Sequence, residues 1–177
     1  MYGARSGRRA WDREVVDAAA TPRQSGAMHG SYAVTCTTRA EPSQVWPLLL
    51  DARTWPQWGT VDALVLDQCE HLSADGHDTV GAVRAFRTGR VVTRERVVEL
   101  RPYECFAYYG VDNPVLSDYT AEIVLGADPA GGTLITWHGS YRAAFGMHLL
   151  LRLTLGRTMQ RMVDGLARAA VQPADGL

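Results

Sequence analysis

The chain has 177 residues, a formal net charge of -1 and a hydrophobic share of 46%. This size fits one folded domain with a substantial core. No stretch reaches the roughly 18 consecutive apolar residues of a membrane-spanning helix, and the near-neutral charge argues against nucleic acid as the main partner. Cys36, Cys69 and Cys105 are isolated and odd in number, which predicts a reduced, cytoplasmic protein.

The N-terminal segment differs in composition from the rest of the chain. Residues 1–30 mix Arg, Gly, Ala, Ser and acidic residues without lasting periodicity, and no apolar stretch follows the early arginines. This composition predicts a disordered extension rather than a secretory signal. We therefore expect a folded domain over residues 31–171 and a short tail over residues 172–177. Met28 is an alternative start of the folded unit.

The central part of the chain predicts one strand, two short helical segments and a series of strands. Residues 32–38 alternate β-forming residues and predict the first strand. A helix then opens with Ser43 as N-cap or Pro42 as first helical residue, and residues 54–58 form a second short helix or tight turn. Further strands are predicted over residues 61–70, 81–87, 91–100, 105–111, 118–125 and 133–141. Turn residues and no helices separate these strands, so they should pair antiparallel in one meander.

A long helix without internal Pro is predicted between Gly146 and about Ala170. Apolar residues recur along it at intervals of three or four, at Leu151, Leu155, Met159, Met162, Leu166 and Ala170. A charged stripe recurs on another face, at Arg157, Arg161, Asp164 and Arg168. These two stripes predict an amphipathic helix that packs its apolar face against the sheet.

Four segments carry a resemblance to a known family: residues 40–46 (AEPSQVW), 55–58 (WPQW), 95–102 (ERVVELRP) and 131–137 (GGTLITW). Together with the order of elements, they resemble the polyketide cyclase/dehydrase and lipid-transport family of the START-like superfamily, which includes the birch-pollen-allergen type. The resemblance covers about residues 31–170. It implies an α+β helix-grip fold, in which a curved antiparallel sheet wraps around a long C-terminal helix and encloses a deep cavity. It also implies variable function among cyclases, dehydrases, carriers of hydrophobic ligands and receptors.

Strand alternation predicts which side chains face the cavity. In the last strand, Trp137 and Tyr141 share the inner face, whereas His138 lies on the outer face. In the strand before, Tyr119 is in phase with apolar residues and should point inward. Aromatic and flexible apolar side chains suit a hydrophobic ligand, although each could equally serve ordinary core packing. The candidate ligand-binding residues are Trp46, Trp58, Phe86, Trp137, Tyr141, Met147, Leu155 and Met159.

Arg84 is the principal candidate for chemistry because it shares a strand face with Phe86. If that face is the inner one, a buried guanidinium needs a carboxylate or a polar ligand. Glu95 on the neighbouring strand is the expected partner. In a cyclase, Arg84 could hold a ketone or enolate oxygen, and Tyr108 or Tyr119 could supply a proton. The alternative is a structural ion pair or an Arg84 that lies in solvent.

The histidine and glycine patterns argue against a metal or nucleotide cofactor. No pair of the five histidines has His-x-His or His-Glu-x-x-His spacing. The Gly131-Gly132 pair is typical of a hairpin turn, since neither a Gly-x-Gly-x-x-Gly nor a Walker pattern surrounds it. We therefore expect no cofactor and no metal site.

Three functional hypotheses remain open at the level of sequence. The first is a cofactor-independent cyclase or dehydrase that folds a reactive polyketide-like chain inside a dry cavity. The second is a carrier or sensor that holds a lipid-like or polyketide-like molecule without a chemical step. The third is a protein-interaction module, with a homodimer as one possible form.

Overall fold

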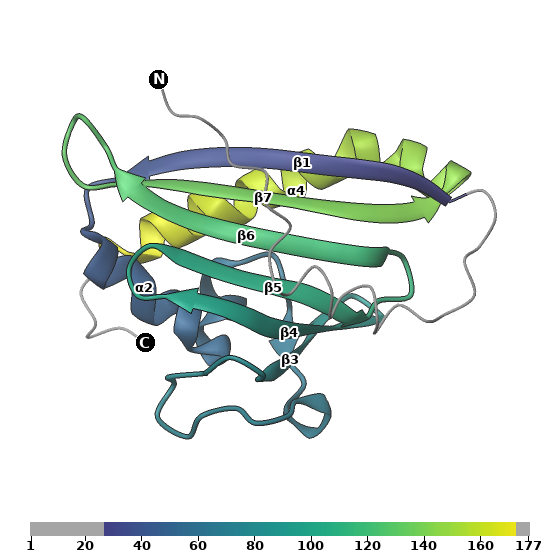
Figure 1. Ribbon diagram of the computed structural model, residues 1–177, viewed down its shortest axis with the longest axis horizontal. Helices are drawn as coiled ribbons and strands as arrows, with labels where there is room; N and C mark the ends of the chain where they lie inside the picture. Colours follow the sequence, from purple (N-terminus) through teal and green to yellow (C-terminus); the bar gives the residue numbers. More distant parts are fainter. Residues whose placement is uncertain (1–26, 173–177) are drawn as a thin grey trace.

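The computed structural model describes residues 27–172 as a curved antiparallel sheet that packs against a long helix (Figure 1). The strands are β1 (Ala27–Thr38), β2 (Ala63–Leu64), β3 (Val83–Thr88), β4 (Val91–Arg101), β5 (Cys105–Asp112), β6 (Ser117–Ala127) and β7 (Thr133–Ala144). The helical elements are α2 (Pro42–Leu50), η1 (Ala52–Thr54), α3 (Trp55–Trp58), η2 (Leu66–Gln68) and α4 (Phe145–Ala169). The seven strands lie in the order β1-β7-β6-β5-β4-β3-β2, which is the predicted meander with β1 added at its end. The α+β helix-grip fold is thus confirmed.

Strand β1 begins before the predicted start of the domain. We expected the N-terminal extension to include residues 27–30, but they belong to β1, where Ala27 pairs with Ala144. Strand β7 also runs past its predicted end at residue 141. The two extensions occur together because each added residue of one strand supplies hydrogen-bonding partners for the other. The remainder of the predicted extension, residues 1–26, and residues 173–177 lie outside the described part of the chain.

The strand predicted over residues 61–70 is wrong for most of its length. Only Ala63–Leu64 pairs with β3, and the chain then makes the turn η2 before Glu70 bridges to Val83. Leu66 is 62% exposed in this turn. An apolar residue can therefore match strand alternation and still lie in an edge segment whose pairing is interrupted.

Helices α2 and α3 begin at the sequence signals that predicted them, with one difference in the cap. Glu41, and not Ser43, is the N-cap of α2, and Gln44 completes a capping box by accepting a hydrogen bond from the Glu41 backbone N–H at 2.9 Å. Pro42 occupies the first turn, where its missing N–H costs little. The turn η1 follows α2 and leads into α3, so these elements bring Trp55 and Trp58 under the sheet.

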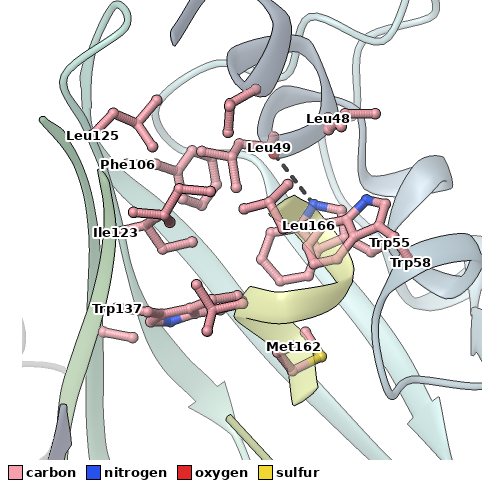
Figure 2. Packing of buried hydrophobic residues seen from close by; sticks show 14 of the residues in the cluster. Leu48, Leu49, Trp55, Trp58, Phe106, Ile123, Leu125, Trp137, Met162 and Leu166 are labelled. Atoms are coloured by element: carbon pink, nitrogen blue, oxygen red, sulfur yellow. Dashed lines mark hydrogen bonds between the residues drawn. The ribbon is translucent and has the colours of Figure 1, made fainter. Parts of the chain in front are cut away.

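The C-terminal half of α4 packs on the concave face of the sheet. Met159, Met162 and Leu166 are buried, as the apolar stripe predicted. The inner face of β7 carries the fully buried Ile135 and Trp137, which confirms the predicted phase of this strand. Figure 2 shows these layers meeting, with Trp137 and Ile123 from the sheet opposite Leu166 and Met162 from the helix.

Candidate functional site

Trp55 occupies the centre of the space between the sheet and the helices (Figure 2). Its ring stacks on Phe86 with centroids 5.2 Å apart and meets Trp137 edge to face at 5.7 Å. The indole Nε1 donates a hydrogen bond to the Leu49 carbonyl at 3.3 Å. Trp55 lies in one of the four segments that carry the family resemblance, but it was not among the predicted ligand-binding residues. The sequence offered no signal that distinguished it from its neighbour Trp58.

Neither of two grooves found among the described residues is lined by α4, where the hollow was expected. One groove of about 340 Å³ is lined by residues of β1, β6 and β7, which include Glu122 and His138 of the outer face and also Tyr32 of the inner face. A second of about 320 Å³ lies beside η2 and the β4 residue Arg94. Where the sequence predicted open space, the structure places Trp55 and its aromatic neighbours.

Arg84 points inward, which decides between the two directions left open by the sequence, and its side chain has no exposed surface. Its Nε lies 3.1 Å from Asp78 Oδ2, and its Nη2 donates to the Leu50 carbonyl. The guanidinium carbon also lies 4.7 Å from the centroid of the Phe106 ring, within the range of a cation–π interaction. Three kinds of contact therefore hold this charge in a site that contains no bulk solvent.

The ion-pair partner of Arg84 differs from the expected one. Glu95 stands directly opposite Arg84 in the β3–β4 register, but the ion pair forms with Asp78. Asp78 belongs to the polar loop before β3, and it is only 2% exposed. Its other carboxylate oxygen accepts a hydrogen bond from the Ser73 backbone N–H at 2.8 Å, which fixes the loop in place. Only the folded path of this loop brings the acid to the arginine.

Arg84, Asp78 and Glu95 form a polar cluster, in which two buried atoms have no hydrogen-bond partner within the described residues. They are Arg84 Nη1 and Glu95 Oε1. Burial raises the pKa of Glu95 to about 8, and the opposing effect of Arg84 only partly offsets this shift. Glu95 is therefore mostly protonated at neutral pH. The site holds a fixed guanidinium beside a neutral carboxylic acid that can donate a proton.

Three tyrosine hydroxyls form a second part of the cluster. The Tyr119 hydroxyl lies 2.7 Å from the Tyr32 hydroxyl and 3.4 Å from the Tyr108 hydroxyl. Burial raises the pKa of Tyr119 to about 12 and raises the pKa values of Tyr32 and Tyr108 as well. All three are thus hydrogen-bond donors at neutral pH. The inward direction of Tyr119 was predicted from alternation and Tyr108 was a candidate proton donor of open phase, whereas Tyr32 was missed.

The phase of β1 could have identified Tyr32. Tyr32 shares a face with the buried Val34 and pairs with Gly139 on β7. A Cβ at Gly139 would lie 2.7 Å from the Tyr32 hydroxyl, so glycine leaves room for this ring. Tyr119 lies beside the other two tyrosine hydroxyls because strand β6 is irregular next to it. The register of β6 shifts between Ser117 and Thr120, and Asp118 adopts a positive φ of 49°.

The eight candidate ligand-binding residues do not gather at one place. Phe86, Trp58 and Trp137 are buried in the aromatic group around Trp55. The Trp46 ring lies 6.1 Å from Tyr103 in the β4–β5 turn. The others lie along β7 and α4, where Tyr141 and Met159 are buried and Met147 and Leu155 are half-buried.

A separate acidic group lies on the outer face of the sheet. The Glu122 carboxylate accepts a hydrogen bond from the Cys105 thiol at 3.1 Å and pairs with His138 Nε2 at 3.2 Å. Burial and the neighbouring Glu122 together raise the pKa of Cys105 to about 12, so this thiol is not a nucleophile at neutral pH. Among the described residues, no three His, Cys, Asp or Glu side chains are grouped so that they could hold a metal ion.

Comparisons with solved structures agree with the observed fold. The Zhui aromatase/cyclase from Streptomyces sp. R1128 has a TM-score of 0.64 at 16% identity, covering 85% of this chain and 99% of that one. Norcoclaurine synthase from Thalictrum flavum has a TM-score of 0.62 at 12% identity, covering 85% and 98%. The di-domain ARO/CYC StfQ from the steffimycin biosynthetic pathway has a TM-score of 0.64 at 14% identity, and the match covers 90% of this chain but 53% of that protein. These identities show a shared fold.

No curated protein matches the chain in sequence. In the described region, no helix is long and apolar enough to cross a membrane. A family model described as polyketide cyclase / dehydrase and lipid transport matches residues 29–171. This range contains all of α4 and all the strands, apart from the first two residues of β1. The chain therefore belongs to the polyketide cyclase/dehydrase and lipid-transport family.

Proposed function

We propose that this protein binds a mostly apolar small molecule, polyketide-like or lipid-like, on the concave face of the sheet next to α4. One observation carries the proposal: Arg84 Nη1 and Glu95 Oε1 are buried at opposite register positions without a partner among the described residues. Such an unsatisfied atom costs about 1–3 kcal/mol. A ligand carbonyl or hydroxyl that hydrogen-bonds both groups would recover this free energy.

The apolar part of the ligand would extend away from Trp55. Glu95, Tyr119 and Leu155 are each half-buried, so they are less tightly covered than Trp55, which is only 2% exposed. The helix residues on this side include the half-buried Met147 and Leu151. A ligand lying along them would contact apolar side chains without displacing the central aromatic group.

The enzymatic form of this proposal is a cyclisation without a cofactor. An enol carbon of the bound chain attacks a ketone carbon of the same chain, while Arg84 holds the ketone oxygen. That oxygen takes the proton of Glu95 and becomes a hydroxyl, and the Glu95 carboxylate recovers a proton from the enol hydroxyl. Loss of water from the adduct would complete a dehydration. The site supplies orientation as well as this proton transfer.

A carrier without a chemical step is the second candidate. It is favoured by the contacts of Arg84, whose charge already has Asp78, the Leu50 carbonyl and the Phe106 ring as partners. The charge of this guanidinium is thus balanced without a substrate, and Nη1 alone of its nitrogens lacks a hydrogen-bond partner among the described residues. In this form, Arg84 and Glu95 would recognise the polar end of the ligand.

Two measurements test the proposal and separate its forms. Native mass spectrometry of protein purified from its own host should detect a bound small molecule. A synthetic linear poly-β-ketone thioester should then give a different distribution of cyclised products with wild type and with Glu95→Gln. Tyr109→Phe is the control, because Tyr109 alternates with the buried Tyr108 on β5 and lies on the other face.

The outcomes are distinct. Binding with a Glu95-dependent product distribution supports the cyclase, and binding with identical products in both proteins supports the carrier. If neither a co-purified molecule nor the thioester binds, the proposal fails in both forms.

A further inference from the structure

The N-terminal half of α4 presents four large apolar side chains to solvent. Phe145 is 70% exposed, Leu149 55%, Leu150 52% and Leu153 64%. Phe145, Leu149 and Leu153 are spaced by four residues, so they lie on one face of the helix. We call these four residues the apolar patch. Single exposed apolar residues are common on protein surfaces. Four large apolar residues within nine helical positions form a continuous surface, which is typical of a binding site.

The position of α4 explains why the apolar patch is uncovered. The C-terminal half of the helix passes behind the sheet, whereas the N-terminal half lies along the β1 edge (Figure 1). There the inner side of the helix already uses His148, Leu151 and Leu155, which are buried or half-buried. The apolar patch therefore does not contribute to the packing of α4 against the sheet. Met28, which is 41% exposed and opposite Ala143 at the same end of β1, adds apolar surface beside the start of the helix.

The charged side chains that α4 itself carries between positions 145 and 163 all have one sign. Arg152, Arg157 and Arg161 are exposed, and no acidic residue occurs between positions 145 and 163. None of the three makes an ion pair with another residue of the described region. An apolar face bordered by arginines is typical of helices that lie in the interface of an anionic bilayer. Arginines can extend to the lipid phosphates while leucines reach the acyl chains.

We propose that the N-terminal half of α4 binds the surface of an anionic lipid bilayer. The apolar patch enters the boundary between headgroups and acyl chains, and Arg152, Arg157 and Arg161 contact the phosphates. A second copy of the chain fits this surface less well, because a two-fold contact would bring like charges together without carboxylates to pair with them. The proposal goes beyond the proposed function, since surface binding requires neither a bound ligand nor a chemical step.

Vesicle flotation with the full chain tests the proposal. The probes are vesicles of phosphatidylcholine alone and vesicles of phosphatidylcholine mixed with phosphatidylglycerol. Wild type should float with the anionic vesicles, and added salt should weaken this binding. The double variant Leu149→Asp/Leu153→Asp should bind at least about tenfold less, because charges at the acyl boundary are costly. Leu66→Asp is the matched control, since Leu66 is a similarly exposed leucine (62%) far from α4.

A second pair of variants tests the charges. Arg157→Glu/Arg161→Glu should weaken binding to anionic vesicles, whereas the control Arg90→Glu, in the exposed β3–β4 turn, should leave it unchanged. Thermal unfolding checks that each variant remains folded. If the aspartate variant unfolds, Leu149→Ser/Leu153→Ser replaces it.

Three results would overturn the proposal. The first is absence of vesicle binding by wild type. The second is anionic binding that the substitutions in the apolar patch do not reduce. The third is a dimer in light scattering that the same substitutions dissociate, without vesicle binding, which would identify a second copy as the occupant.

Discussion

Arg84 and Glu95 face each other across β3 and β4, yet Arg84 forms its ion pair with Asp78. This arrangement leaves Glu95 without a charged hydrogen-bond partner in the described region, and burial keeps it protonated at neutral pH. A buried Arg–Asp pair carries no net charge, so the neutral state of Glu95 is electrostatically consistent. Arg84 and Asp78 thus act as a structural pair, and Glu95 remains available for a ligand.

Asp78→Asn should strongly destabilise the fold. The substitution leaves the fully buried Arg84 charge without its carboxylate, and breaking such a pair costs about 3–5 kcal/mol. Urea unfolding at neutral pH measures this loss. Asp75→Asn is the control, because Asp75 pairs with His77 on the surface and its removal should change stability little. A loss for Asp78→Asn as small as that of the control would contradict the structural role of the pair.

Glu95 should make stability fall as pH rises. Its pKa is raised from 4.5 to about 8 in the folded protein, so between these values the folded state keeps a proton that the unfolded state has lost. The contribution of Glu95 is therefore present below pH 4.5 and lost as pH approaches 8, with a slope of at most about 1.4 kcal/mol per pH unit.

Glu95→Gln removes this dependence. Relative to wild type, the variant should gain stability as pH is raised from 5 to 8, as urea unfolding at each pH would show. A constant difference between the two proteins across this range would mean that Glu95 titrates normally in the folded state.

Trp55→Ala should create a cavity at the centre of the aromatic group. Removing a buried Trp costs about 3–5 kcal/mol of unfolding free energy, and the rings of Phe86 and Trp137 would border the space. Added indole should then raise the melting temperature of the variant and leave wild type unchanged. If indole stabilises both proteins equally, the binding site lies elsewhere.

Two glycines of α4 should respond to alanine in opposite directions. A Cβ at Gly165 would collide with the backbone carbonyl oxygen of Trp58, so Gly165→Ala should cost about 1–3 kcal/mol by forcing α3 and α4 apart. At Gly156, no other atom lies within 4 Å of an added Cβ. Gly156→Ala should therefore stabilise the helix by up to about 1 kcal/mol. Thermal and urea unfolding of both variants measure these changes in the free energy of unfolding. Equal changes for the two variants would mean that α3 and α4 do not pack closely at Gly165.

Much of the fold could be predicted because its signals are local. Alternation placed Trp137 and Tyr141 on the inner face of the last strand, and three- or four-residue spacing identified the buried stripe of α4. Turn residues between strands predicted antiparallel neighbours. The errors lie at an edge: the chain near Leu66 matches strand alternation, but pairing there depends on how far β3 extends beside it.

The candidate site was predictable only in part. Alternation placed Tyr119 on the inner face, whereas the inward direction of Arg84 and the phase of the strand with Tyr108 stayed open at the level of sequence. It could not find Asp78, because a loop has no periodicity that indicates where its side chains point. Tyr32 depends on a glycine far along the chain, at position 139, that makes room for its ring.

The sequence by itself determined the order of strands and helices, the inner face of the sheet and the family to which the chain belongs. The order and the inner face follow from backbone periodicity and turn residues, which act over a few neighbouring positions, whereas the family is identified by the match of residues 29–171 to its model. Only the tertiary structure decided that Trp55 fills the interior, that Asp78 neutralises Arg84 and that the side chains of the apolar patch are exposed. Each of these depends on which distant surfaces meet, and that is set by close packing across the whole core.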